Sequence, residues 1–174
     1  MSFAANAQRI ELFLSDVDGV LTDGRVIFDN QGVETKEFHI RDGLAIKLWQ
    51  QAGGRFGLIT GRNSQIVRVR ATELGIDIVR QGVEDKLTVV KQLLAELKLS
   101  PEQVAYMGDD LPDYPVLKYV GAAIAPADAC REVRGAAHLV TQTPGGHGAM
   151  REAIEALLQA QGRWELLVKR YGVE

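Results

Sequence analysis

The sequence predicts an α/β fold in which helices cover both faces of a parallel β-sheet and a β-hairpin projects from one edge. Short apolar runs alternate along the chain with segments of helical spacing. These runs lack the polar alternation of a half-exposed strand, which is typical of parallel strands buried on both faces. The stretch RVIFDNQGVETKEFHI departs from this order, because it places two extended segments around Asp29-Asn30-Gln31-Gly32 and so predicts a hairpin.

The elements follow in chain order from these patterns. We expect buried strands at Leu12–Ser15, Arg55–Thr60, Ile76–Val79, Val104–Met107, Ala122–Ile124 and Leu139–Val140. The spacing between them predicts helices at Leu44–Ala52, Ser64–Leu74, Leu87–Lys98, Tyr114–Val120 and Ala129–Arg134, and from Gly148 to about Arg170. The hairpin is expected over about 24–41, and a flexible glycine-rich tail with its helix over about 143–174.

Composition restricts the function classes. A chain of 174 residues fits one domain, residues 1–174, with a sizeable core. The formal charge of −3 argues against nucleic acid or an acidic membrane as the partner, since both require a basic excess. One cysteine, no leader-like start and no apolar run of ~18 residues predict a cytoplasmic protein.

Polar residues follow four of the predicted strands. These strand ends are Asp16-Val17-Asp18-Gly19, Thr60-Gly61-Arg62, the loop from Gly82 to Lys86, and Gly108-Asp109-Asp110. Because ligands bind beyond the carboxyl ends of parallel strands, we expect the four ends to meet at one edge. That edge would gather Asp16, Asp18 and Asp109 with a hydroxyl, a lysine and an arginine.

Three carboxylates at one place require a counter-charge. Their mutual repulsion is relieved by a divalent cation with oxygen ligands, and magnesium prefers a few carboxylates with water and a substrate phosphate. An Asp-x-Asp-Gly sequence on its own is equally typical of solvated turns and helix caps. The three further strand ends in matching places favour the metal site.

Four short motifs follow one another along the chain: DVDGVLTDG, LITGR, DK and MGDDLPD. Their order characterises the haloacid dehalogenase (HAD) superfamily, and the chain resembles the phosphatases of that superfamily. The resemblance implies a Rossmann-like fold and a nucleophile, Asp16, that forms an aspartyl phosphate while Asp18 acts as acid and then base. It implies that Thr60, Gly61 and Lys86 hold the phosphate. It also implies that Asp16, the Asp18 carbonyl and Asp109 bind Mg²⁺, with Asp110 and Asp113 as supporting residues.

The intervals from Asp16 to Thr60 and from Lys86 to Asp109 leave no room for an inserted lid domain of ~50 residues. The chain resembles, over nearly its whole length, the capless tetrameric phosphatases that act on 3-deoxy-D-manno-octulosonate 8-phosphate (KDO 8-phosphate), in lipopolysaccharide precursor synthesis. The stretches that support this resemblance are DVDGVLTDG with the hairpin, the FHIRDG loop, LITGR, GDDLPDYPVL and GGHGAMRE. In that family the hairpins assemble the tetramer and a glycine-rich C-terminal tail reaches an adjoining site. By position, the sugar acid would be contacted by His39, Ile40, Arg41, Asp42, Gly43 and Arg62. Lys47 and Arg70, on the helices after these loops, are further candidates.

Other functions stay open at this point. A nine-carbon sialic or deaminated sialic acid 9-phosphate would fit the same chemistry. If the chain were a non-catalytic assembly domain, we would expect it to lack at least one of the motif residues Asp16, Asp18, Lys86 and Asp109. All four are present. A phosphoacceptor signalling domain would have no use for Asp18.

Overall fold

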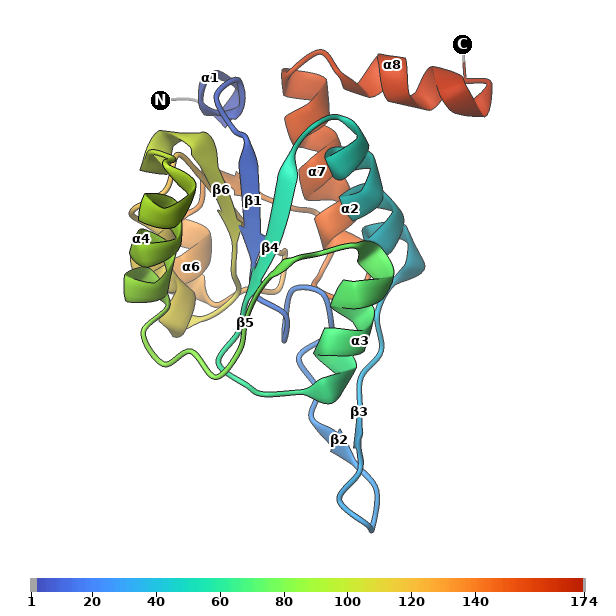
Figure 1. Cartoon of the computed structure of the whole chain (residues 1–174), viewed down its shortest axis with the longest axis vertical. Helices are drawn as coiled ribbons and strands as arrows, with labels where there is room; N and C mark the ends of the chain where they lie inside the picture. The colour runs from blue at the N-terminus through green and yellow to red at the C-terminus, as the bar shows by residue number, and fades with distance from the viewer. Residues whose placement is uncertain (1–2, 174) are drawn as a thin grey trace.

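The central sheet has six strands, all parallel, in the order β5-β4-β1-β6-β7-β8, so the predicted fold class is confirmed. The computed structural model describes residues 3–173. The sheet strands are β1 Leu12–Ser15, β4 Arg55–Ile59, β5 Ile78–Arg80, β6 Val104–Met107, β7 Ala122–Ala125 and β8 Leu139–Val140. Figure 1 shows this sheet between two layers of helices.

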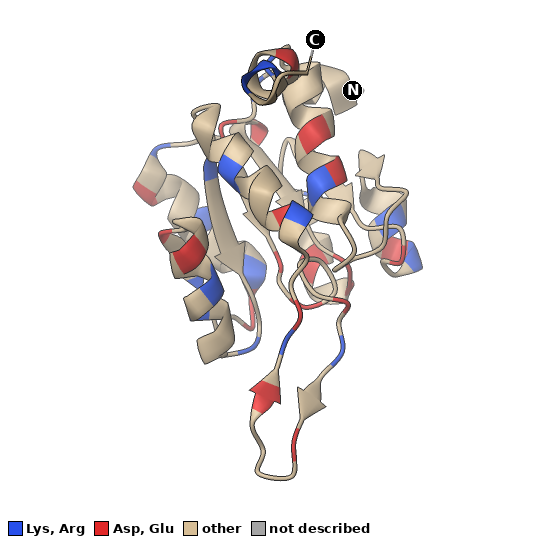
Figure 2. Cartoon of the chain, turned by 90° about the vertical axis from the view of Figure 1, so that its right-hand side faces the viewer, with Lys and Arg blue, Asp and Glu red and all other residues tan. Residues whose placement is uncertain are grey.

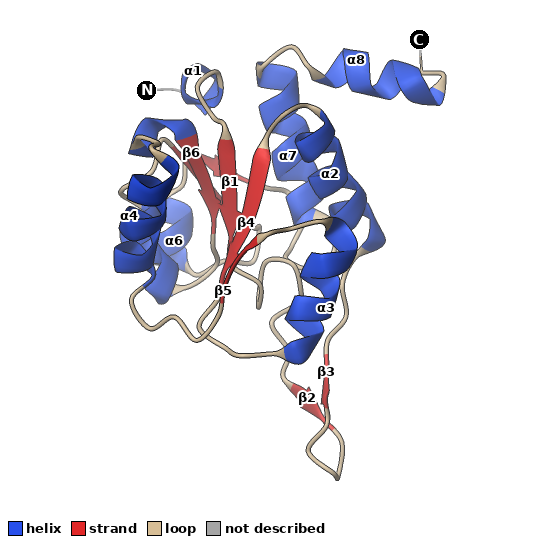
Figure 3. Cartoon of the chain, viewed as in Figure 1, coloured by secondary structure: helices blue, strands red, loops and turns tan. Residues whose placement is uncertain are grey.

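The helices on one face are α2 Ile40–Gln51, α3 Gln65–Leu74 and α7 Ala149–Ala160, and those on the other are α4 Lys86–Leu97, α5 Tyr114–Leu117 and α6 Arg131–Ala136. Figure 3 shows the two layers by element type. Short helices α1 Phe3–Ala7 and α8 Trp164–Val168 lie near the ends of the described chain, and three 3-10 turns are at Pro101–Gln103, Leu111–Asp113 and Lys169–Tyr171. Within residues 3–173, no helix is long and apolar enough to cross a membrane.

Strand β1 lies at the centre of the sheet. It pairs with β4 on one side and β6 on the other, so that Ser15 is level with Leu58 and Met107. Both faces of β1 are buried, which explains its unbroken apolar run. The residues that follow β1, β4 and β6 therefore emerge side by side at one edge.

The hairpin is made of β2 Ile27–Phe28 and β3 Glu34–Thr35, and it projects from the edge at which these strands end (Figure 1). Asp29 closes its turn, because its carboxylate accepts the amides of Gln31 and Val33 at 2.9 and 2.8 Å. Gly32 takes a positive φ of 79° there. In the described residues these are the only strands between β1 and β4, and no lid domain is inserted.

Several predicted boundaries were wrong. The helix expected at Leu44 begins at Ile40, because His39 accepts the Arg41 amide through its side chain and caps it. The FHIRDG stretch is thus a helix start and not a loop. The strand expected at Ile76 begins at Ile78, since Gly75 ends α3 in the left-handed conformation. The C-terminal helix is divided in two near Gly162, which also has a positive φ.

Candidate active site

Asp16 and Asp109 meet at the sheet edge because β1 and β6 are neighbours. The amide of Asp16 donates to the Met107 carbonyl at 3.0 Å, which extends the β1–β6 ladder by one residue and brings the two aspartates together. The positive φ of Gly19 then turns the chain away. A side chain at Gly19 would collide with Asp109, since its Cβ would lie 2.1 Å from Oδ2 of that residue. The glycine is therefore what allows the two motifs to approach.

Lys86 connects the nucleophile candidate to a third carboxylate. It is the first residue of α4, which begins after Asp85 caps the helix by accepting the Thr88 amide. Its ammonium lies 2.6 Å from Asp16 Oδ2 and 2.6 Å from Asp113 Oδ1, and the side chain is 4% exposed. Burial lowers the pKa of Lys86, but the two carboxylates outweigh this effect and raise it. Lys86 is a fixed positive charge in the floor of the site.

Asp113 is the most buried carboxylate of the group. Its Oδ1 also accepts the Tyr106 hydroxyl at 2.6 Å, and its Oδ2 accepts the Asp109 amide at 3.1 Å. Gly108 makes room for it, because a Cβ at Gly108 would lie 2.4 Å from Asp113. With both oxygens engaged, Asp113 positions Lys86 and the Asp109 backbone, in keeping with a supporting role.

The carboxylates outnumber the positive charge among them. Asp16, Asp109 and Asp113 each offer an oxygen within 4.8 Å of the others, and Lys86 is the one cation paired with this group in the described residues. Burial raises the pKa of Asp16 to about 6, with Asp113 adding to the effect and Lys86 opposing it. Burial, Asp16 and Asp113 raise the pKa of Asp109 to about 7. All three donors are hard oxygens, so the cluster fits a divalent cation such as magnesium.

A pocket of about 490 Å³ opens above this cluster. It is lined by Asp16, Asp18, Thr60, Gly61, Arg62, Val83, Glu84, Lys86, Asp109, Asp110, Pro112 and Asp113. Residues from all four predicted strand ends therefore share one cavity. Val83 and Glu84 lie in the predicted Gly82–Lys86 loop and Pro112 lies in MGDDLPD, but none of them was named as a site residue. Tyr106, beneath the floor, was predicted only as part of a buried strand.

Comparison with known proteins agrees with this geometry. Residues 65–152 match the haloacid dehalogenase-like hydrolase family. The 3-deoxy-D-manno-octulosonate 8-phosphate phosphatase KdsC of Yersinia pestis is 45% identical over 159 residues, which cover 91% of this chain and 85% of the relative. The chain belongs to this phosphatase family within the HAD superfamily.

Solved structures of the family superpose closely on the chain. A probable YrbI family phosphatase of Pseudomonas syringae matches with a TM-score of 0.96 and 47% identity, covering 99% of this chain and 98% of that one. The phosphatase of Moraxella catarrhalis, solved in complex with magnesium, phosphate and KDO, matches with a TM-score of 0.95 and 38% identity over 97% of each chain. The HAD fold and the resemblance drawn from the motifs are confirmed.

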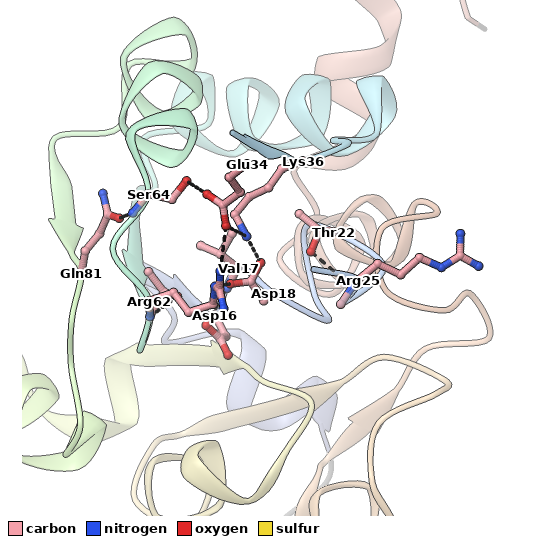
Figure 4. A network of polar contacts seen from close by, with 12 residues as sticks. Asp16, Val17, Asp18, Thr22, Arg25, Glu34, Lys36, Arg62, Ser64 and Gln81 are labelled. Carbon is pink, nitrogen blue, oxygen red and sulfur yellow. Dashed lines mark hydrogen bonds and ion pairs between the residues drawn. The ribbon is translucent and has the colours of Figure 1, made fainter. Parts of the chain in front are cut away.

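Asp18 lies on the rim of the pocket in contact with the hairpin. Figure 4 shows that Lys36, the residue directly after β3, reaches back to pair with Asp18 Oδ1. Arg62 approaches the other oxygen, Oδ2, at 3.8 Å. Lys36 was not predicted as a site residue, because its stretch was interpreted as a surface for pairing between subunits.

Of the expected sugar contacts, Arg62 lines this pocket and the others do not. Asp42 is 3% exposed, and its Oδ1 accepts the Arg151 amide of α7 at 2.8 Å, so within its own chain it is bonded to a helix. Gly43 is also buried. A Cβ at this position would lie 2.4 Å from the Arg70 guanidinium. Asp42 connects α2 to α7, and Gly43 allows Arg70 of α3 to lie close against α2. The others lie outside the pocket of their own chain: His39, Ile40, Arg41, Lys47 and Arg70.

The glycine-rich segment at 143–148 is packed, not flexible. The Gly146 amide donates to the Val20 carbonyl at 2.9 Å, and a Cβ at Gly145 would lie 1.9 Å from the Gly19 carbonyl oxygen. These glycines permit close approach to the loop that carries Asp16 and Asp18. The α7 helix that follows buries Met150, Ile154 and other apolar residues in the core.

Proposed function

We propose that this chain is a magnesium-dependent phosphatase that hydrolyses KDO 8-phosphate to KDO and inorganic phosphate. The observation that carries the proposal is the meeting of Asp16, Lys86 and Asp109 in one pocket, in a chain whose relatives are named for this activity. The Moraxella catarrhalis relative holds magnesium, phosphate and KDO together, which supports the same cofactor and product here. The reaction would serve lipopolysaccharide precursor synthesis in the cytoplasm.

In the first half of the reaction, an Asp16 carboxylate oxygen attacks phosphorus and the bond from phosphorus to the sugar oxygen breaks. The departing alkoxide takes a proton from Asp18. Asp16 is held for this attack, since Oδ1 accepts the Val17 amide at 2.7 Å and Oδ2 meets Lys86. Lys86, Thr60 and the Gly61 amide bind the phosphoryl oxygens.

In the second half, Asp18 takes a proton from water as that water attacks phosphorus. The bond from phosphorus to Asp16 breaks, and inorganic phosphate leaves. Asp16, Asp109 and the Asp18 carbonyl would hold magnesium, which when bound neutralises charge on the phosphate. The carboxylate of the sugar acid would meet Arg62, whose planar guanidinium suits it and whose side chain is 42% exposed.

We propose a tetramer, supported by the apolar surface of the hairpin. Val26, Ile27, Phe28 and Val33 are 51%, 41%, 55% and 59% exposed, and such an edge invites pairing with further copies. Ile40 nearby is 75% exposed. His39, Ile40, Arg41 and Lys47 would then contact the sugar acid in a site completed by a neighbouring subunit.

The test is a phosphate-release assay over sugar-acid and simple sugar phosphates, with magnesium and with a chelator. We expect strong preference for KDO 8-phosphate over a nine-carbon sialic acid 9-phosphate, and no turnover under chelation. Asp16→Asn should abolish turnover, whereas Asp18→Asn should accumulate phosphorylated Asp16, visible as an increase in intact mass. Near-normal hydrolysis by the Asp16→Asn protein would refute the mechanism.

A further inference from the structure

The base of the hairpin forms a closed ring of charges with the rim of the pocket. Lys36 pairs with Asp18 and also lies 3.4 Å from Glu34 Oε1. Arg62 Nη2 lies 2.9 Å from the same Glu34 oxygen, while its Nε faces Asp18 at 3.8 Å. Two carboxylates thus alternate with two cations (Figure 4), and each cation faces both carboxylates.

The burial of Lys36 shows that this ring is more than a surface ion pair. Its side chain is 1% exposed, although lysine on a hairpin arm could readily extend into water. Removing an ammonium from water costs several kcal/mol unless carboxylates replace the hydration, and here two of them do. Acidic loops gather at this end of the sheet (Figure 2), so Lys36 also counters their charge.

Glu34 anchors the ring to the β4–α3 loop. Its second oxygen, Oε2, accepts the Ser64 hydroxyl at 2.6 Å, and the Ser64 amide donates to Gln81 at 2.6 Å. Hydrogen bonds from Ser64, Arg62 and Lys36 keep the pKa of Glu34 below its ordinary value. Glu34 is therefore a fixed negative charge that holds Arg62 from one side.

We propose that Lys36 positions the carboxylate of Asp18 for proton transfer and that Glu34 positions the guanidinium of Arg62 for the sugar acid, so that the hairpin completes the active site of its own chain. The inference rests on the proposed acid–base role of Asp18. Lys36 holds Asp18 at Oδ1, and Arg62 Nε lies 3.8 Å from Oδ2, so the carboxylate is fixed from both sides. Neither Lys36 nor Glu34 touches the reacting atoms; each acts through its neighbour.

Substrates with different leaving groups can distinguish a positioning role of Lys36 from general structural support. An alkoxide must be protonated as it departs, whereas p-nitrophenolate leaves without a proton. General acid catalysis is worth ~10²–10⁴-fold, so a misplaced Asp18 should forfeit part of that factor on an alkyl phosphate alone. The ratio kcat/KM reports the step up to phosphorylation of Asp16, where only the acid role of Asp18 is required.

The experiment measures kcat/KM on the sugar phosphate and on p-nitrophenyl phosphate for Lys36→Met, Lys36→Arg and Asp18→Asn. Lys36→Met should lose about 10–100-fold on the sugar phosphate but less than about 3-fold on p-nitrophenyl phosphate, and Lys36→Arg should recover much of the loss. Adding Lys36→Met to Asp18→Asn should cause little further loss, because the two residues act as one unit. Arg25→Met, on the other arm and 78% exposed, is the matched control.

Equal losses on both substrates, additive losses in the double variant, or wild-type activity in Lys36→Met would each overturn the role of Lys36. If Asp18→Asn itself loses equally on both substrates, the proposed function of Asp18 fails instead. Should Lys36→Met not fold, Glu34→Gln decides: it should raise KM for the sugar phosphate several-fold, through Arg62, while kcat on the sugar phosphate and kcat/KM on p-nitrophenyl phosphate stay near the wild-type values. An unchanged KM in that variant would refute the inference.

Discussion

Removal of magnesium should make the stability of this protein fall as pH rises. Asp16 and Asp109 have pKa values raised from 3.8 to about 6 and about 7 in the metal-free fold. Between about pH 4 and pH 7 the folded state therefore binds more protons than the unfolded chain. Linkage then requires the free energy of unfolding to decrease with increasing pH across that window.

The size of the decrease follows from the same two groups. From pH 5 to pH 8, the buried Asp16 accounts for about 1 kcal/mol, and the half-buried Asp109, discounted for solvent screening, for about 2 kcal/mol. The combined loss is on the order of 3 kcal/mol. At about 2 kcal/mol per molar urea, the unfolding midpoint should drop by more than 1 M. With saturating magnesium both carboxylates ionise beside a cation, so this loss should disappear.

The assay is urea unfolding at pH 5 and pH 8, in chelator and in magnesium, at one protein concentration. His138 contributes an opposite slope because burial lowers its pKa, but it lies beside Ala123, outside the acidic cluster, so the difference between the two conditions cancels it. Asp109→Asn is the control, and it should lose most of the pH slope together with the magnesium effect. A metal-free protein whose midpoint is level or rises from pH 5 to pH 8 would refute the reasoning.

Three further predictions concern the supports of the site. Asp113→Asn should lower the free energy of unfolding by about 2 kcal/mol, because Lys86 loses a buried charged partner, whereas Tyr106→Phe should cost about 1 kcal/mol; urea unfolding that reverses this order would contradict the network. Gly145→Ala should reduce kcat at least 10-fold by displacing the Gly19 backbone, whereas Gly135→Ala, with no atom near its Cβ, should leave kcat unchanged. Equal kcat values for these two variants in steady-state assays would contradict this reasoning. Truncation before Thr143 should abolish folding, read by far-UV circular dichroism, because α7 supplies core residues; a folded truncated chain would count against the packing described.

The parts of the site that the sequence predicted are those that depend on strand order alone. Asp16, Thr60 and Asp109 each follow a buried strand, and parallel strands end at the same edge whatever their detailed packing. Lys86 was predicted because it ends the loop that follows a predicted strand and belongs to the DK motif. These positions needed only the alternation of strands and helices, together with motif order.

The parts that were missed depend on contacts between segments that no local pattern connects. Asp42 was expected at the substrate because its stretch resembled a binding loop, but its carboxylate is held by an amide of α7, a helix more than a hundred residues later. Gly145 was expected to give flexibility, and its need for close approach becomes visible only when the Gly19 loop lies against it. Lys36 pairs with Asp18 only because the hairpin doubles back.

The two ends of the hairpin differ in chemistry, so that the proposed assembly and the proposed catalytic support can be tested separately. Its apolar residues around Phe28 are exposed and invite pairing with other copies. At its base the Lys36 side chain is buried and the Glu34 side chain is 15% exposed, and both contact residues of the same chain. The ring around Asp18 therefore needs no partner to form. A Phe28→Ser variant that dissociates should keep the leaving-group dependence that Asp18 confers, while KM for the sugar acid rises because the neighbouring His39, Arg41 and Lys47 are lost. Loss of that dependence on dissociation would mean that the hairpin base is held by the assembly.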